Sequence, residues 1–171
     1  TGERNTATGY QSLYSNTTAS NNSAFGYQAL KANTTGASNT ASGVNSLRSN
    51  TTGTSNTASG WNSLYTNTTG SNNTAIGRNA LFYNTVADKN TALGYYALYA
   101  NTTGDRNTAV GYKALETNVD GDRNVAIGYQ SLKTMDPSSN ADTMNVAIGY
   151  ASLEATTTGV RNTGVGGYVM Q

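Results

Sequence analysis

Apolar and polar residues recur along this chain with a period of 17 residues. If the first Asn of each unit is called position one, position three is Ala in every unit except the last, where it is Gly164, and position nine is Leu in all units but the last. Only one interval is longer, 21 residues, between Asn124 and Asn145. Such self-similarity predicts a solenoid, in which one unit cannot bury its own apolar face and must stack on its neighbours. Position one is occupied by Asn5, Asn22, Asn39, Asn56, Asn73, Asn90, Asn107, Asn124, Asn145 and Asn162.

The order of residues within one unit predicts short strands joined by turns. Period-two alternation places positions one and three on the inner face and positions two and four on the outer face of a first strand. Position five is Gly in every unit, which predicts a bend. Positions six to nine predict a second short strand. The N-T-T-G segment, as at Asn101–Gly104, predicts a turn in which Asn takes positive φ and Gly closes the corner.

Stacked units predict an all-β parallel β-solenoid, or β-roll, of about nine to ten coils that forms a single domain over residues 1–171. A rise of about 4.8 Å per coil gives a rod of roughly 43 Å. The Asn at position one is expected to form a ladder, each side chain bonding its equivalent one coil away, because an unpaired buried amide is costly. Residues 133–144 carry the four extra residues and are expected to bulge as a lateral loop. Residues 164–171 lose the pattern and predict a cap or a handover to another domain, and Thr1–Arg4 match Thr103–Arg106, so we expect the chain to begin inside a repeat.

Position four becomes uninterruptedly apolar in the second half of the chain. Because position three faces inward, this column is expected to face solvent, and an exposed apolar stripe is either an interface or an aggregation hazard. Three chains closing around an axis would bury it, so the sequence predicts a homotrimer. The predicted interface residues are Ile76, Leu93, Val110, Ile127, Ile148 and Val165.

Composition narrows the function classes. Charged residues make up 11% of the chain, the net charge is +1, and there is neither Cys nor His. We therefore expect no nucleic-acid partner, no membrane insertion, no metal or other cofactor and no enzymatic activity, since no nucleophile with a base can be assembled. The two carboxylates within Val119–Arg123 fall short of a six-ligand calcium loop.

Aromatic residues recur at position six and, in part of the chain, at position ten. Such rings either stack on one another and shield the strand edge or offer flat faces to sugar rings. The candidate glycan-binding patch consists of Trp61, Tyr65, Phe82, Tyr83, Tyr96 and Tyr99. Several Asn residues also match the N-x-S/T glycosylation pattern, although turn chemistry explains most of them. They are Asn16, Asn21, Asn33, Asn50, Asn67, Asn72 and Asn101.

Two segments, Asn124–Gly128 and Asn145–Gly149, both read N-V-A-I-G and resemble the S-x-A-I-G repeats of YadA-type trimeric autotransporter adhesin heads. The longer motif N-T-A-x-G-Y-Q-A-L is similar to repeats of phage and viral tail fibres. The resemblance covers nearly the whole chain and implies a trimeric, left-handed β-roll on a bacterial cell surface or a virion, where it would contact a host receptor or glycan. It is specific for architecture and a poor guide to function.

Two other functions stay open at this stage. A regular Thr column at position two, such as Thr74 and Thr91, is a feature of ice-binding solenoids, although a paired T-x-T column would suit that function better. A passive spacer shaft without any ligand is the third reading. Thermal hysteresis would indicate ice binding, glycan binding would indicate an adhesin, and neither would indicate a spacer.

Overall fold

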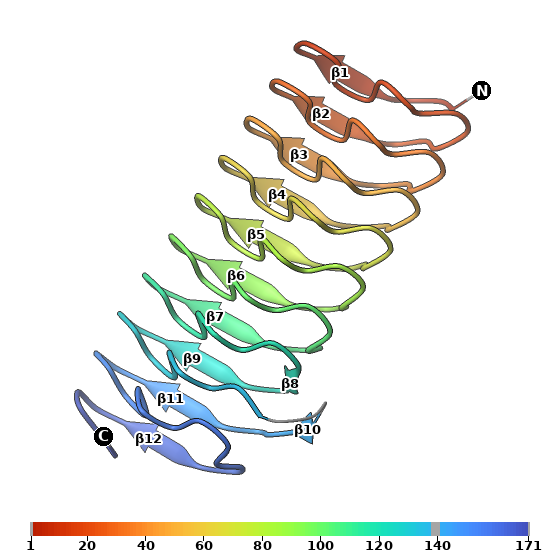
Figure 1. Ribbon diagram of the computed structural model, residues 1–171. Coiled ribbons are helices and arrows are strands. Elements are labelled where there is room, and N and C mark those ends of the chain that lie inside the picture. Colours follow the sequence, from red (N-terminus) through yellow and green to blue (C-terminus); the bar gives the residue numbers. More distant parts are fainter. Residues whose placement is uncertain (1, 138–140, 171) are drawn as a thin grey trace.

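A computed structural model describes residues 2–137 and 141–170 and shows a rod built around one long parallel sheet (Figure 1). The sheet has ten strands in chain order, and each inner strand pairs with the strands of the coils before and after it. The two ends of the chain lie at opposite ends of the rod (Figure 1). The predicted all-β parallel solenoid with 17 residues per coil is therefore confirmed.

All ten strands of this sheet are three residues long and span positions two to four of the repeat. Pairing is in register throughout, so that Ala92 lies between Ala75 and Ala109. The strands of the main sheet are β1 (Thr6–Thr8), β2 (Ser23–Phe25), β3 (Thr40–Ser42), β4 (Thr57–Ser59), β5 (Thr74–Ile76), β6 (Thr91–Leu93), β7 (Thr108–Val110), β9 (Val125–Ile127), β11 (Val146–Ile148) and β12 (Thr163–Val165). A second, two-stranded parallel sheet consists of β8 (Gly121–Asp122) and β10 (Ala141–Asp142).

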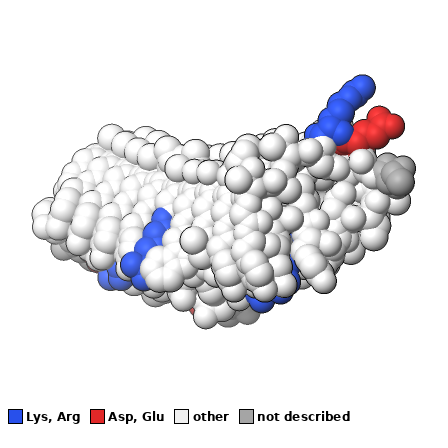
Figure 2. All heavy atoms as spheres, turned by 90° about the horizontal axis from the view of Figure 1, so that it is seen from above, with Lys and Arg blue, Asp and Glu red and all other residues white. Residues whose placement is uncertain are grey.

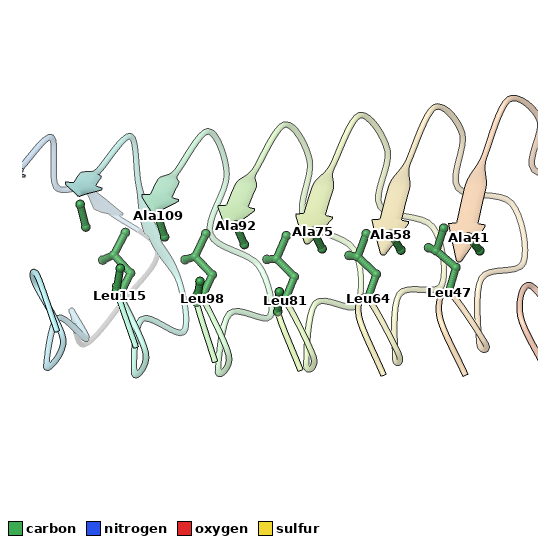
Figure 3. Close-up of a cluster of buried hydrophobic side chains, with 14 of the residues drawn as sticks. Ala41, Leu47, Ala58, Leu64, Ala75, Leu81, Ala92, Leu98, Ala109 and Leu115 are labelled. Carbon is green, nitrogen blue, oxygen red and sulfur yellow. The ribbon is translucent and has the colours of Figure 1, made fainter. Parts of the chain in front are cut away.

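The interior of the rod is one alanine and one leucine wide. Ala92 points inward from its strand, and Leu98 reaches toward it from the opposite wall of the same coil (Figure 3). Both side chains are fully buried, as are their equivalents in the neighbouring coils. A larger residue at position three would push the two walls apart, which explains why this column stays small.

The predicted second strand at positions six to nine is wrong. These residues form turns, because positions seven and nine both take positive φ, as in Tyr96 with 58° and Leu98 with 50°. Hydrogen bonds between coils nevertheless continue: the N–H of Tyr96 donates to the carbonyl of Arg78 in the preceding coil, and the N–H of Leu98 donates to Ala114 in the following one. Left-handed φ is costly for a leucine, and burial of its side chain offsets that cost.

The predicted Asn ladder at position one is confirmed. The side-chain oxygen of each Asn accepts a hydrogen bond from the backbone N–H of the equivalent Asn in the next coil. The Oδ1 atom of Asn73 accepts the backbone N–H of Asn90 at 2.9 Å, and Nδ2 of Asn73 donates to the carbonyl of Ala87 at 2.8 Å. Each amide thus ties its own coil closed and joins it to the next. The side chains from Asn22 to Asn145 are fully buried, so this network operates without water.

The Asn of N-T-T-G forms a second ladder, which the sequence did not predict. Nδ2 of Asn101 donates to Oδ1 of Asn84 at 3.0 Å and to the carbonyl of Gly104 at 2.9 Å. The expected positive φ at this Asn is wrong. Position seventeen, such as Arg106 with 58°, takes the left-handed conformation instead.

The irregular parts of the sequence follow the solenoid where the structure describes them. In the insertion, β10 pairs with β8 and Pro137 is buried, whereas residues 138–140 lie outside the described residues. Near the end, β12 extends the main sheet, Gly166 keeps the positive φ of position five, and Met170 keeps that of position nine. The coil geometry therefore persists to Met170, and a capping role for residues 164–171 stays a prediction. Within residues 2–137 and 141–170 no helix has the length and apolar character needed to cross a bilayer.

Candidate functional site

The outer face of the main sheet carries the predicted apolar stripe. Strand geometry points positions two and four away from the interior, and four of the stripe residues retain between 37% and 43% of their accessible surface: Ile76, Leu93, Ile127 and Ile148. Val110 is half-buried, and Val165 in the last strand is more exposed. Because the strands are in register, these side chains form a straight row along the rod. Its outward orientation in the single chain agrees with the expectation from the sequence.

A column of stacked aromatic rings runs beside the sheet at position six. The ring centroids of Tyr112 and Tyr129 are 5.0 Å apart with an interplanar angle of 8°, and Tyr95 and Tyr150 extend the stack on either side at 5.4 Å and 4.9 Å. Stacked rings cover one another's faces, so sugars cannot lie flat on the rings inside the column. The four tyrosines nevertheless expose between 38% and 49% of their surface.

The structure brings together five of the six predicted glycan-binding residues. Phe82 lies 5.1 Å from Tyr65 and 4.8 Å from Tyr83, measured between ring centroids, and Tyr99 contacts Tyr83 at 5.1 Å and Tyr96 at 4.4 Å. These rings also cover one another in stacked and edge-to-face pairs. The cluster is therefore a stabilising feature of the wall, with Tyr83 as its most exposed member.

Trp61, the sixth predicted residue, belongs to the position-six column instead. The guanidinium carbon of Arg78 lies 4.3 Å from the centre of its ring and 5.8 Å from that of Tyr95. Arg78 thus takes the place of a ring and joins Trp61 to the tyrosine stack through cation–π contacts. The indole is half-exposed, at 49% of its accessible surface.

Charge on this wall is sparse and mostly paired. Burial, followed by a hydrogen bond with Tyr83, raises the pKa of Tyr99 to about 12. The Nζ atom of Lys113 lies 2.9 Å from Glu116, and this hydrogen bond raises the pKa of the lysine. Figure 2 shows a face of the rod that is mostly uncharged, with a basic and an acidic side chain side by side at one end and a few basic side chains along one edge. Both raised pKa values lie above neutral pH, so Tyr99 stays uncharged and Lys113 stays positively charged there.

A short column of aspartates at position sixteen was not predicted. Oδ1 of Asp88, Asp105 and Asp122 each accepts the backbone N–H of the preceding coil at 2.7 Å. Burial raises the pKa of Asp122, and the carboxylates of Asp105 and Asp142 raise it further. No group of three or more metal-ligating side chains converges within the described residues. The sequence signal for this column was the recurrence of Asp at one repeat position in three successive units. In the structure these carboxylates accept hydrogen bonds from backbone N–H groups.

Most of the potential glycosylation sites are buried, and the half-buried Asn16 donates from Nδ2 to the carbonyl of Ala19 at 3.1 Å. Asn33, Asn50, Asn67 and Asn101 are fully buried in the second ladder, where Nδ2 is already hydrogen-bonded. Only the turn residues Asn21 and Asn72 are exposed. Turn and ladder chemistry therefore explains the repeated N-T-T pattern.

The described part of the chain contains no enclosed pocket. Comparison with protein-family models, with curated proteins and with solved structures found no match to this chain. Any ligand must therefore bind to an open surface, and the arguments about function depend on this chain's own residues.

Proposed function

We propose that this chain is a segment of an extracellular fibre, located on a bacterial surface or a virion, in which three identical rods pack side by side. The observation that supports this best is the straight row of apolar side chains from Ile76 to Val165 on the outer face of a rigid sheet. Complete burial of each half-exposed side chain would contribute roughly 1 kcal/mol. A monomer would leave this whole row in water.

Three-fold packing suits the geometry of the rod. A coil rise of about 4.8 Å is the same in every copy, so parallel rods can place equivalent coils at equal heights along a shared axis. A closed three-fold arrangement also buries the stripe of every chain, whereas an open arrangement would continue to add chains. The polar residues Thr8, Ser42 and Ser59 at position four predict a wetter axis toward the start of the rod.

Sedimentation equilibrium of the whole chain tests the trimer. We expect a mass of three times the 17.8 kDa of one chain. The double variant Leu93→Lys and Ile127→Lys should be monomeric, because it places lysines on the shared axis. Val86→Lys is the control, since Val86 is an exposed apolar residue, at 49% against 38% for Leu93 and Ile127, and lies outside the stripe. A monomeric wild type, or a trimer that survives the double substitution, would contradict the proposal.

We further propose an adhesive role, in which the fibre contacts host glycans or receptors through its exposed wall. Three rods with equivalent surfaces would add weak contacts through multivalency, which can raise apparent affinity by about 10² to 10⁴. Binding of the trimer to a glycan array or to host cells tests this role. If binding is absent, the chain is a passive spacer. If binding is unchanged in Trp61→Ala and Tyr65→Ala, these two residues do not contribute to it.

Ice binding is the second candidate, and one observation favours it. In the first half of the rod, positions two and four both present hydroxyls on the same flat face, as in Thr6 with Thr8 and Thr40 with Ser42. These residues are exposed, although Phe25 interrupts the pattern. Thermal hysteresis in the wild type that is lost in Thr40→Val would support ice binding, and an absence of hysteresis would exclude it.

A further inference from the structure

Two inner positions of the position-six column lack a ring, Val44 and Arg78. Tyr10 and Tyr27 stack at 5.3 Å, and further along Arg78 covers one face of Trp61. Between Tyr27 and Trp61 the column contains Val44, which has no ring to stack on either of them. A gap therefore separates the two aromatic residues, with the valine as its floor.

Surface exposure is consistent with this gap. Tyr112 and Tyr129, which have rings on both sides, expose 40% and 41% of their surface, whereas Tyr27 exposes 47% and Trp61 exposes 49%. Tyr150 shows the same effect, because its neighbour Tyr168 is tilted by 55° and Tyr150 exposes 49%. The rings beside Val44 thus each have a face that no other ring covers.

The spacing of the coils leaves room for one ring between Tyr27 and Trp61. Tyr27 and Trp61 are two coils apart, which is about 10 Å along the rod at about 4.8 Å per coil. Elsewhere in the column this same two-coil interval, between Tyr95 and Tyr129, is filled by the ring of Tyr112 at 5.4 Å and 5.0 Å from its neighbours. A guest ring above Val44 would contact both walls at the distances that the column already uses.

Polar side chains lie beside the gap. Position-seven residues lie next to the rings of position six, as the 4.4 Å between Tyr95 and Tyr96 shows. In the coils around the gap these residues are the amides Gln28, Asn45 and Asn62. Gln28 is already bonded to Gln11 and Arg48, and Nδ2 of Asn45 is bonded to Oδ1 of Asn62 at 3.1 Å. Two ring faces with amides at their edge suit a ring that has hydroxyl groups on its rim and C–H groups on its faces.

We propose that the gap above Val44 is a carbohydrate subsite, in which one pyranose ring is held between Tyr27 and Trp61. This inference deepens the adhesive role proposed above and rests on it. The site is open, so a single sugar should bind with a dissociation constant of about 1 mM or weaker. Each rod presents the gap once, and a trimer would present it three times.

Trp61 is the sole tryptophan of the chain, so its fluorescence reports on this gap directly. The whole chain would be titrated with methyl β-D-glucopyranoside, methyl β-D-galactopyranoside and methyl α-D-mannopyranoside, and separately with phenol. We expect a saturable change in emission with at least one glycoside. Saturation-transfer NMR of the same glycoside provides a second readout that does not depend on the indole.

Val44→Tyr is the decisive variant, because it completes the column with the ring that the other coils use. It should weaken glycoside binding at least about tenfold, or about 1.4 kcal/mol, without loss of folding. Val44→Ala is the matched control, since it keeps the gap open and should bind as the wild type does. No response to any glycoside, binding of phenol alone, or equal binding by Val44→Tyr would overturn the proposal.

These outcomes are separable from those of the proposed function. A monomeric rod that still binds a glycoside in the wild type and not in Val44→Tyr supports the subsite while it overturns the trimer. A trimer that binds host cells equally well as wild type and as Val44→Tyr, and shows no glycoside response, overturns the subsite while the adhesive role stands.

Discussion

Oδ1 of Asn90 accepts a hydrogen bond of 2.8 Å from the backbone N–H of Asn107, its equivalent in the next coil. Nδ2 of the same residue donates to the carbonyl of Gly104 at 2.8 Å. One fully buried side chain thus satisfies two backbone groups that water cannot reach. The rod has few large apolar side chains per coil, so these amides are central to its stability.

Asn90→Leu should destabilise the chain by roughly 2–5 kcal/mol, because it leaves a buried N–H and a buried carbonyl without partners. Urea unfolding followed by circular dichroism measures the change. Thr91→Val is the control, since Val125 and Val146 already occupy its repeat position, and its effect should stay within about 0.5 kcal/mol. Equal effects of the two substitutions would contradict the ladder argument.

Gly94→Ala should destabilise the chain by about 1–3 kcal/mol or more. Gly94 has a φ of 139°, and a Cβ atom there would lie 2.4 Å from the carbonyl oxygen of Gly111 in the next coil. Gly167→Ala is the matched control, because a Cβ atom there meets nothing closer than 3.8 Å and its φ is not left-handed. Thermal unfolding of both variants should show a loss only for Gly94→Ala.

Leu98→Val should cost more than the removal of one methylene implies, about 2–4 kcal/mol. The residue is fully buried with a φ of 50°, a conformation that β-branched side chains strongly disfavour. Leu98→Met keeps the volume and is unbranched at Cβ, and Met170 adopts a similar φ of 53° at the same repeat position. It should cost less than about 1.5 kcal/mol. A larger loss for the methionine variant in chemical unfolding would refute this explanation.

Asn118→Ala should lower the free energy of unfolding less than Asn101→Ala does, and the difference between the two variants should be about 1–3 kcal/mol. Oδ1 of Asn101 accepts from Asn118 at 3.0 Å, whereas Oδ1 of Asn118 is buried without a partner among the described residues. The cause is Met135, which occupies the next position of the ladder and whose side chain has no N–H to donate. The comparison requires unfolding curves for the two variants, and a larger loss for Asn118→Ala would show that the orphaned oxygen carries no penalty.

The stability of the chain should increase as pH falls from 7 toward about 4. Burial raises the pKa of both Asp120 and Asp122 above the ordinary value. The folded chain therefore binds protons that the unfolded chain does not, so this contribution to stability is present at low pH and is lost as pH rises through the folded pKa. Asp122→Asn keeps an acceptor for the N–H of Asp105 and should flatten the pH dependence of the urea midpoint. An unchanged slope would contradict the assignment.

The sequence predicted the structure correctly at repeat positions where one residue type recurs because the geometry there admits few others. The Ala and Leu columns predicted the interior, and the glycine at position five predicted the bend, because each permits a geometry that other residues resist. The prediction of a strand at positions six to nine was wrong, although Tyr, Gln and Leu form a composition that is common in strands. Their left-handed φ values come from the need to return the chain within one coil, and propensity does not encode that need.

The candidate site was less predictable than the fold. The sequence placed the stripe from Ile76 to Val165 on the outer face, and the structure agrees. It also grouped Trp61 with Tyr65 and Tyr99, yet the indole stacks with Arg78 in a different column. Which faces of the rings are covered depends on side-chain orientation between coils, and one unit of sequence does not contain this information.

By itself, the amino-acid sequence determined the period, the residues inside, the residues outside and the parallel order of the coils. Only the tertiary structure decided that each coil contributes one strand to the main sheet, that a second Asn column forms a ladder, and that the missing ring at Val44 leaves one face of Tyr27 and one of Trp61 without a stacked ring. The physical reason is that the period follows from repetition along the chain. Hydrogen-bond partners and ring stacking, in contrast, form between residues 17 positions apart and exist only once the coils are stacked.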